Sequence, residues 1–113
     1  MRKFLKFTHS GMDFLIPVND ILSVKAATQT KVDILLRNGF GHTATNAGEV
    51  PAIILTASTA NTDDKTKQQL NALVAEIGNA LETSWTNPIY AVTLPYAIDG
   101  VAHDQVDFSA GTI

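Results

Sequence analysis

The sequence predicts an α+β domain in which a mostly antiparallel β-sheet is covered on one face by one long amphipathic helix. Three features indicate this fold class. Short runs with the two-residue period of strands fill the first half of the chain, a stripe of apolar residues at helical spacing follows, and a last strand-like run comes after it. With 113 residues, of which 45% are hydrophobic, the chain can bury one core without metal or disulfide bonds.

The first half contains five strand-like runs separated by turn signals. Ser10 and Gly11 form a turn short enough to join the first two runs as a hairpin. Pro17 must then lie at a strand end or a sheet edge, because it has no N–H to donate. The expected strands are residues 4–7, 13–18, 21–27, 31–37 and 50–56.

Two segments of this half allow more than one interpretation. Residues 41–48 contain no large apolar residue and form either a short edge strand or an exposed loop. Residues 50–56 fit a buried strand or a short helical turn, and their β-branched residues favour the strand. Asn38 and Gly39 mark a turn whose backbone requires positive φ.

A helix over residues 63–84 is the most clearly patterned element. Thr62 is a suitable N-cap, and Asp63 and Asp64 lie where negative charge stabilises a helix N-terminus. Asn87 and Pro88 limit the helix at about Trp85, which we expect to close the end of the core. The apolar stripe that should cover the sheet consists of Leu70, Leu73, Val74, Ile77 and Leu81.

The segment after the helix divides into a strand and a tail. Residues 89–94 alternate like a strand that Pro95 terminates, and this strand can return to the sheet. From Asp99 onward the chain is acidic and rich in small residues. We therefore expect a single domain over residues 1–98 and a tail over residues 99–113, mobile unless it docks on its own domain or on a neighbouring copy.

Composition excludes several function classes. The chain has no cysteine, which rules out zinc-finger, thiol-nucleophile and disulfide-framework proteins. Its apolar runs are too short to cross a bilayer, and polar residues interrupt the start too early for a signal peptide. The net charge of −3 combines a basic part, residues 1–37, with an acidic remainder, which makes nucleic-acid binding an unlikely role.

No catalytic, cofactor or metal site is expected. His9, His42 and His103 lie in separate segments without the spacing of a metal motif. His9, Ser10 and Asp13 have the residue types of a hydrolytic triad but no nucleophile elbow. A small enzyme would need a concave pocket where these histidines converge with carboxylates.

The uneven charge predicts an interface between copies of the chain. In this hypothesis the acidic tail of one copy, with Phe108 as an apolar anchor, docks on the basic N-terminal strand of a neighbour. Apolar contact must supply most of the affinity, since exposed charges attract weakly at physiological salt. The interface residues are Arg2, Lys3, Lys6, Asp99, Asp104, Asp107 and Phe108.

Several short motifs resemble those of small virion structural proteins of tailed marine bacteriophages. They are Phe4-Leu5-Lys6, Phe14-Leu15-Ile16-Pro17, Ser84-Trp85-Thr86 and Val92-Thr93-Leu94-Pro95. The resemblance implies a non-enzymatic subunit of a capsid or tail, present in many copies with other structural proteins. It also implies a location in the virion, or in the host cytoplasm during assembly.

A second resemblance defines the alternative function. Residues 16–24 and 31–39 are similar to the opening strands of LytTR-type DNA-binding domains. That resemblance implies a small regulatory module that contacts nucleic acid or protein. The acidic second half and the lack of a later basic strand depart from the family, so DNA binding is not carried over to this chain.

Overall fold

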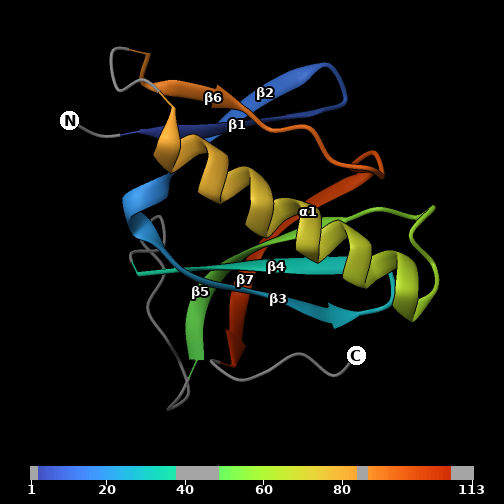
Figure 1. The fold of residues 1–113 in the computed structure, drawn as a ribbon. Helices are drawn as coiled ribbons and strands as arrows, with labels where there is room; N and C mark the ends of the chain where they lie inside the picture. Colours follow the sequence, from blue (N-terminus) through green and yellow to red (C-terminus); the bar gives the residue numbers. More distant parts are fainter. Residues whose placement is uncertain (1–2, 38–48, 84–86, 108–113) are drawn as a thin grey trace.

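In a computed structural model, which describes residues 3–37, 49–83 and 87–107, the chain folds into seven strands and one long helix. The α+β prediction is confirmed, and the strands divide between two sheets (Figure 1). A short 3₁₀-helix, η1, covers Val18–Asp20. The other elements are β1 (Phe4–His9), β2 (Met12–Pro17), β3 (Ile21–Thr28), β4 (Lys31–Leu36), β5 (Glu49–Thr56), α1 (Asp63–Glu82), β6 (Ile89–Ala91) and β7 (Gly100–Asp107).

The smaller sheet has the order β2-β1-β6. β1 and β2 form the expected hairpin, and Ser10 and Gly11 adopt positive φ values of 53° and 76°, as a tight two-residue hairpin turn requires. Pro17 is the last residue of β2, an edge strand, as predicted. β6 returns from the helix to pair in parallel with β1.

The larger sheet has the order β3-β4-β5-β7, with every neighbouring pair antiparallel. β4 is buried from Val32 to Leu36, so both faces of this strand are covered. The two sheets and the helix share one core. Its buried members are Leu5, Phe7, Ile16, Val18, Val32, Ile34, Leu36, Ile53, Leu55, Leu73 and Ala80.

Helix α1 begins where predicted, because the Thr62 side chain accepts a hydrogen bond from the Lys65 N–H at 3.2 Å. It packs on β3 and β4, and its far end is bonded to Lys3 at the start of β1. Figure 1 shows it crossing in front of both sheets. The helix thus contacts the larger sheet along its length and is bonded to the smaller sheet at its end, so it links the two sheets.

The buried face of α1 is rotated from the predicted stripe. Leu73 is fully buried, and Leu70 and Ile77 pack against the core, but Val74 and Leu81 are about half exposed. Thr66, Gln69 and Ala80 are buried instead. The two polar residues enter the interior because Thr66 bonds to the Thr30 N–H and Gln69 bonds to the backbone of Tyr96.

The segment after the helix differs from the prediction in two ways. The strand expected over residues 89–94 ends at Ala91, because the Glu76 carboxylate accepts the Thr93 N–H at 2.9 Å and draws the chain toward the helix. Gly100–Asp107, expected within a tail outside the domain, pairs along its whole length with β5 as β7. The expected turn at Asn38 and Gly39, the interpretation of residues 41–48, and Trp85 lie outside the described residues.

Candidate functional site

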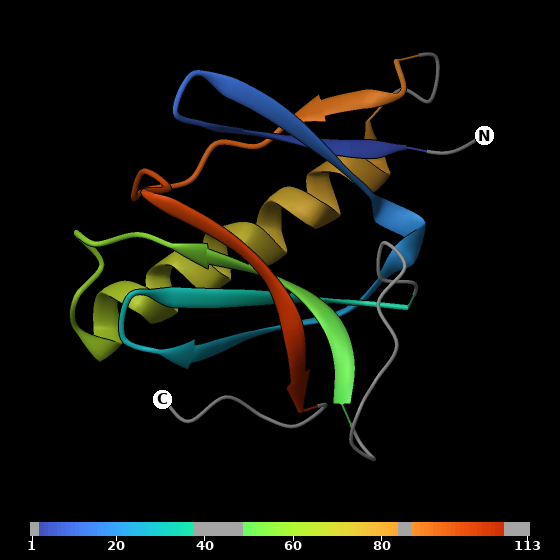
Figure 2. The ribbon, with the colours of Figure 1, turned by 180° about the vertical axis from the view of Figure 1, so that it is seen from behind.

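A cleft of about 470 Å³ opens between β2 and β7. These two strands are edges of different sheets, so the cleft lies where the smaller sheet stops and the larger one begins. Figure 2 shows both strands on the side away from α1. We call this cleft the β2–β7 groove; it is lined by His9, Ser10, Met12, Asp13, Phe14, Leu15, Ile53, Val101, Ala102 and His103.

The β2 wall is built by the hairpin turn. The two-residue turn sets His9 opposite Met12 as a hydrogen-bonded pair of the ladder. Because hydrogen-bonded and open pairs alternate in an antiparallel ladder, the backbone N–H and C=O groups of Asp13 and Leu15 point away from β1. They therefore face the groove from the free edge of β2.

The β7 wall is anchored by Asp99, the residue before the strand. Its carboxylate accepts a hydrogen bond of 2.7 Å from the Ser58 N–H, and its own N–H donates to the Thr56 carbonyl at 2.7 Å. The bond from Ser58 lowers the pKa of the Asp99 carboxyl. From this anchor β7 pairs with β5 in an uninterrupted register of eight residues, which carries Val101 and His103 along the groove.

The surface of the groove is mainly apolar. Met12 is 74% exposed, and Leu15 and Val101 are also among the exposed large apolar side chains. Phe14, which stacks on Phe7 with ring centroids 5.3 Å apart, and Ile53 connect the groove to the core. Apolar side chains gathered along two open strand edges are a feature of sites that bind other chains.

Proteins usually protect exposed strand edges with bulges, prolines or charged side chains. β7 has a regular register and no proline, and its exposed charged side chain among the described ones is Asp104. The opposite edge of the same sheet, β3, has two register shifts, at Ile21/Ser23 and at Ala26/Thr28. Bulges of this kind disrupt pairing, so β7 is the more receptive edge of the larger sheet.

The groove brings together two of the three histidines, His9 and His103, while His42 lies outside the described residues. His9 Nε2 is 3.4 Å from Ser10 Oγ, and His9 Nδ1 is 3.3 Å from the Ile98 carbonyl. Within residues 3–37, 49–83 and 87–107, no three histidine or acidic side chains gather closely enough to hold a metal ion.

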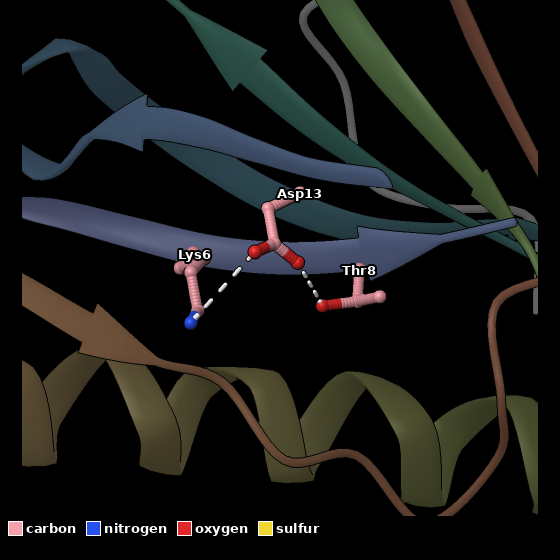
Figure 3. Close-up of polar contacts among 3 residues, drawn as sticks. All are labelled: Lys6, Thr8 and Asp13. Atoms are coloured by element: carbon pink, nitrogen blue, oxygen red, sulfur yellow. Dashed lines mark hydrogen bonds and ion pairs between the residues drawn. The ribbon is translucent and has the colours of Figure 1, made fainter. Parts of the chain in front are cut away.

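Asp13 does not complete a triad with His9 and Ser10. Thr8 and Asp13 face each other across the hairpin, and the Thr8 hydroxyl donates to the Asp13 carboxylate at 2.6 Å (Figure 3). Lys6 Nζ lies 3.9 Å from the other oxygen of that carboxylate. Asp13 thus bonds on the face of the hairpin opposite to His9, and the arrangement supplies no relay to Ser10.

The basic residues expected at the interface are not available as a free charged strand. Lys3 is buried and donates to Thr83 Oγ1 at 2.6 Å, and Lys6 is paired with Asp13. β1 is also the central strand of its sheet, so its edges are already paired. Arg2 lies outside the described residues.

The acidic residues expected in a docking tail lie in or next to the domain's own sheet. Asp99 bonds to Ser58, and Asp104 is an exposed residue of β7. Asp107 ends β7, where its backbone pairs with Glu49. Phe108 lies outside the described residues, so its role as an anchor stays a prediction.

Comparisons with known proteins give no indication of the function of this chain. No protein-family model matches the sequence. No significant similarity is found to curated proteins or to solved structures. Within the part of the chain that the structure describes, no helix combines the length and the apolar character needed to cross a membrane.

Sequence reasoning missed the groove and most residues that line it. Val101 and His103 were assigned to a tail, because small and acidic residues dominate that region. One signal was present in Phe14, Leu15 and Ile16, three successive large apolar residues in a strand. Since successive strand residues face opposite sides, such a run implies that both faces meet apolar surroundings.

Proposed function

We propose that this chain is a non-enzymatic structural subunit that self-associates in many copies, as part of a phage capsid or tail. The observation that carries the proposal is the β7 edge, which has no bulge or proline, beside an apolar groove. Exposed pairing edges and exposed apolar side chains favour association with another chain, which covers both.

The chemistry of the groove supports a binding role over a catalytic one. His9 and Ser10 meet at its rim, where His9 contacts the Ile98 carbonyl, while Asp13 bonds to Thr8 and Lys6 and the nearby Asp99 carboxylate accepts from Ser58. A surface that only has to bind another chain needs apolar area and free backbone groups, and the groove offers both. Other virion proteins are further proposed partners, and the particle or the host cytoplasm during assembly is the proposed location.

The nucleic-acid alternative gains no support from the basic residues. Lys3 bonds to Thr83 and Lys6 pairs with Asp13. Burial raises the pKa of the Asp33 carboxyl, and Lys25 and Lys31 lie near enough to act against that rise. These contacts distribute the positive charge among local partners, whereas a nucleic-acid interface gathers it on one accessible face.

Native mass measured by light scattering over a wide range of protein concentration tests the proposal. We expect a discrete multiple of the 12.1 kDa subunit, or a series of multiples that grows with concentration. A single 12.1 kDa species at all concentrations would contradict it. Salt-dependent binding to duplex DNA by such a monomer would favour the regulatory module instead.

A further inference from the structure

We propose that the β2–β7 groove accepts an extended segment of a second copy of this chain, and that the segment is residues 108–113. The inference rests on the proposed self-association and names the surface that produces it. Within the described part of the chain, a strand added in the groove would meet the edge strand of the smaller sheet on one side and that of the larger sheet on the other.

The backbone of the groove fits strand addition. Asp13 and Leu15 present N–H and C=O groups from the edge of β2, and β7 lies across the groove as the last strand of its sheet among the described residues. A strand placed between them gains main-chain hydrogen bonds, while alternate side chains of that strand enter the apolar floor. Ile53 and Phe14 lie at that floor.

The charge on β7 disfavours an acidic occupant. Asp104 is an exposed carboxylate on this strand, so an acidic segment placed beside it would be repelled. Residues 108–113, Phe-Ser-Ala-Gly-Thr-Ile, carry no charged side chain and have a large apolar residue at each end. They match the apolar groove, whereas residues 99–107 include three aspartates.

The direction of β7 favours a second copy over the same copy. β7 runs away from the hairpin (Figure 2), and Asp107 lies four residues beyond His103, the last residue of β7 in the groove. At about 3.3 Å per residue, Asp107 is roughly 13 Å from His103 along β7. If residues 108–113 turned back toward their own groove, the turn would take at least two of them. The other four would span about 13 Å, so they would reach only the start of the groove.

Substitutions in the groove test the acceptor, each with a control of matched exposure. Val101→Lys places a charge at a side chain 39% exposed on β7, and its control is Leu22→Lys, 37% exposed on β3. Leu15→Glu, at 43% exposure, is matched by Leu81→Glu, at 47% on α1. We expect each groove variant to raise the dissociation constant for self-association at least about tenfold while the controls remain near wild type.

Deletion of residues 108–113 tests whether this segment is the occupant. Mixing the variants tests whether the segment of one copy binds the groove of another. The deletion variant keeps an open groove but has no segment to donate, whereas Val101→Lys keeps the segment but blocks the groove. Each alone should be a monomer, the Val101→Lys variant near the 12.1 kDa of the full chain and the deletion variant lighter by its six missing residues. A mixture should form a 1:1 complex with the summed mass of the two chains. Circular dichroism verifies that every variant is folded, and Leu15→Glu replaces Val101→Lys if the latter fails to fold.

The outcomes separate this inference from the proposed function. Self-association that survives the groove variants and the deletion would overturn the inference and leave the function standing. The same holds if only the Leu22 or Leu81 variant dissociates, because the interface then lies elsewhere. A wild-type monomer overturns both, and in that case loss of 8-anilinonaphthalene-1-sulfonate binding in the groove variants would show a small-molecule site instead.

Discussion

Lys3 Nζ donates a hydrogen bond of 2.6 Å to Thr83 Oγ1, which joins the start of β1 to the C-cap of α1 across eighty positions of sequence. The lysine side chain is buried. The Thr83 hydroxyl in turn donates to the Ala80 carbonyl at 3.0 Å. This link closes the smaller sheet onto the end of the helix.

Removal of the Thr83 hydroxyl should destabilise the fold through Lys3. A hydrogen bond to a charged group contributes more than a neutral one, so we expect Thr83→Val to lower the unfolding free energy by about 2 kcal/mol. In a Lys3→Met background the same change should cost about 1 kcal/mol less, because no buried ammonium then loses a partner. Urea unfolding of the four proteins measures this coupling, and equal costs in both backgrounds would contradict it.

Gln69 holds the segment between β6 and β7 against the helix. Its amide donates to the Tyr96 carbonyl at 2.7 Å and accepts from the Tyr96 N–H at 3.0 Å. We expect Gln69→Leu to cost about 2 kcal/mol, because two backbone groups lose their partner at once. Gln68→Leu is the control, since exposed Gln68 accepts from the Tyr96 hydroxyl and not from the backbone within the described residues, and it should change the urea midpoint little.

These two links mark the limit of what the sequence could predict. The hairpin at Ser10 and Gly11, the start of the helix at Thr62 and the α+β class follow from local patterns, namely turn residues, an N-cap and hydrophobic period. Those patterns are set by residues close together in sequence. Lys3 and Thr83 have no local relationship, so their contact could not be read from either segment.

The errors at the helix and in the second half have the same physical origin. Hydrophobic period assigned Val74 and Leu81 to the buried face, but the buried positions include Thr66 and Gln69, whose polar groups find partners in distant segments. Strand β7 was missed because its residues are small and polar, and its stability comes from pairing with β5. The groove follows from the strand order, which no local pattern contains.

Asp99 should make the stability of the fold depend on acid pH. Its pKa is lowered by the bond from Ser58, so the folded state holds the proton less tightly than the unfolded chain does. That contribution is fully present above the ordinary aspartate pKa and is lost as the pH falls through the lowered value. We expect the free energy of unfolding of Asp99→Asn, measured with urea, to fall less than that of the wild type as the pH is lowered. An equal fall in both proteins would contradict this role.

Asp33 should have the opposite pH dependence. Burial raises the pKa of its carboxyl, although Lys25 and Lys31 act to lower it. Its Oδ1 accepts no hydrogen bond within the described part of the chain. A raised pKa contributes stability that is complete below the ordinary aspartate value and is lost as the pH rises through the raised value. The ionised Asp33 carboxylate therefore destabilises the folded state at neutral pH.

Replacing Asp33 with asparagine removes that charge at nearly constant volume. We expect Asp33→Asn to raise the unfolding free energy at pH 7 by about 1 kcal/mol, because burying an unsatisfied charged oxygen costs more than burying an amide. The gain should shrink as the pH falls toward the ordinary aspartate pKa, where the native carboxyl is already protonated. Asp104→Asn, on exposed β7, serves as the control and should show no such gain. A loss of stability at pH 7 in the Asp33 variant would mean instead that attraction to Lys25 and Lys31 outweighs the burial cost.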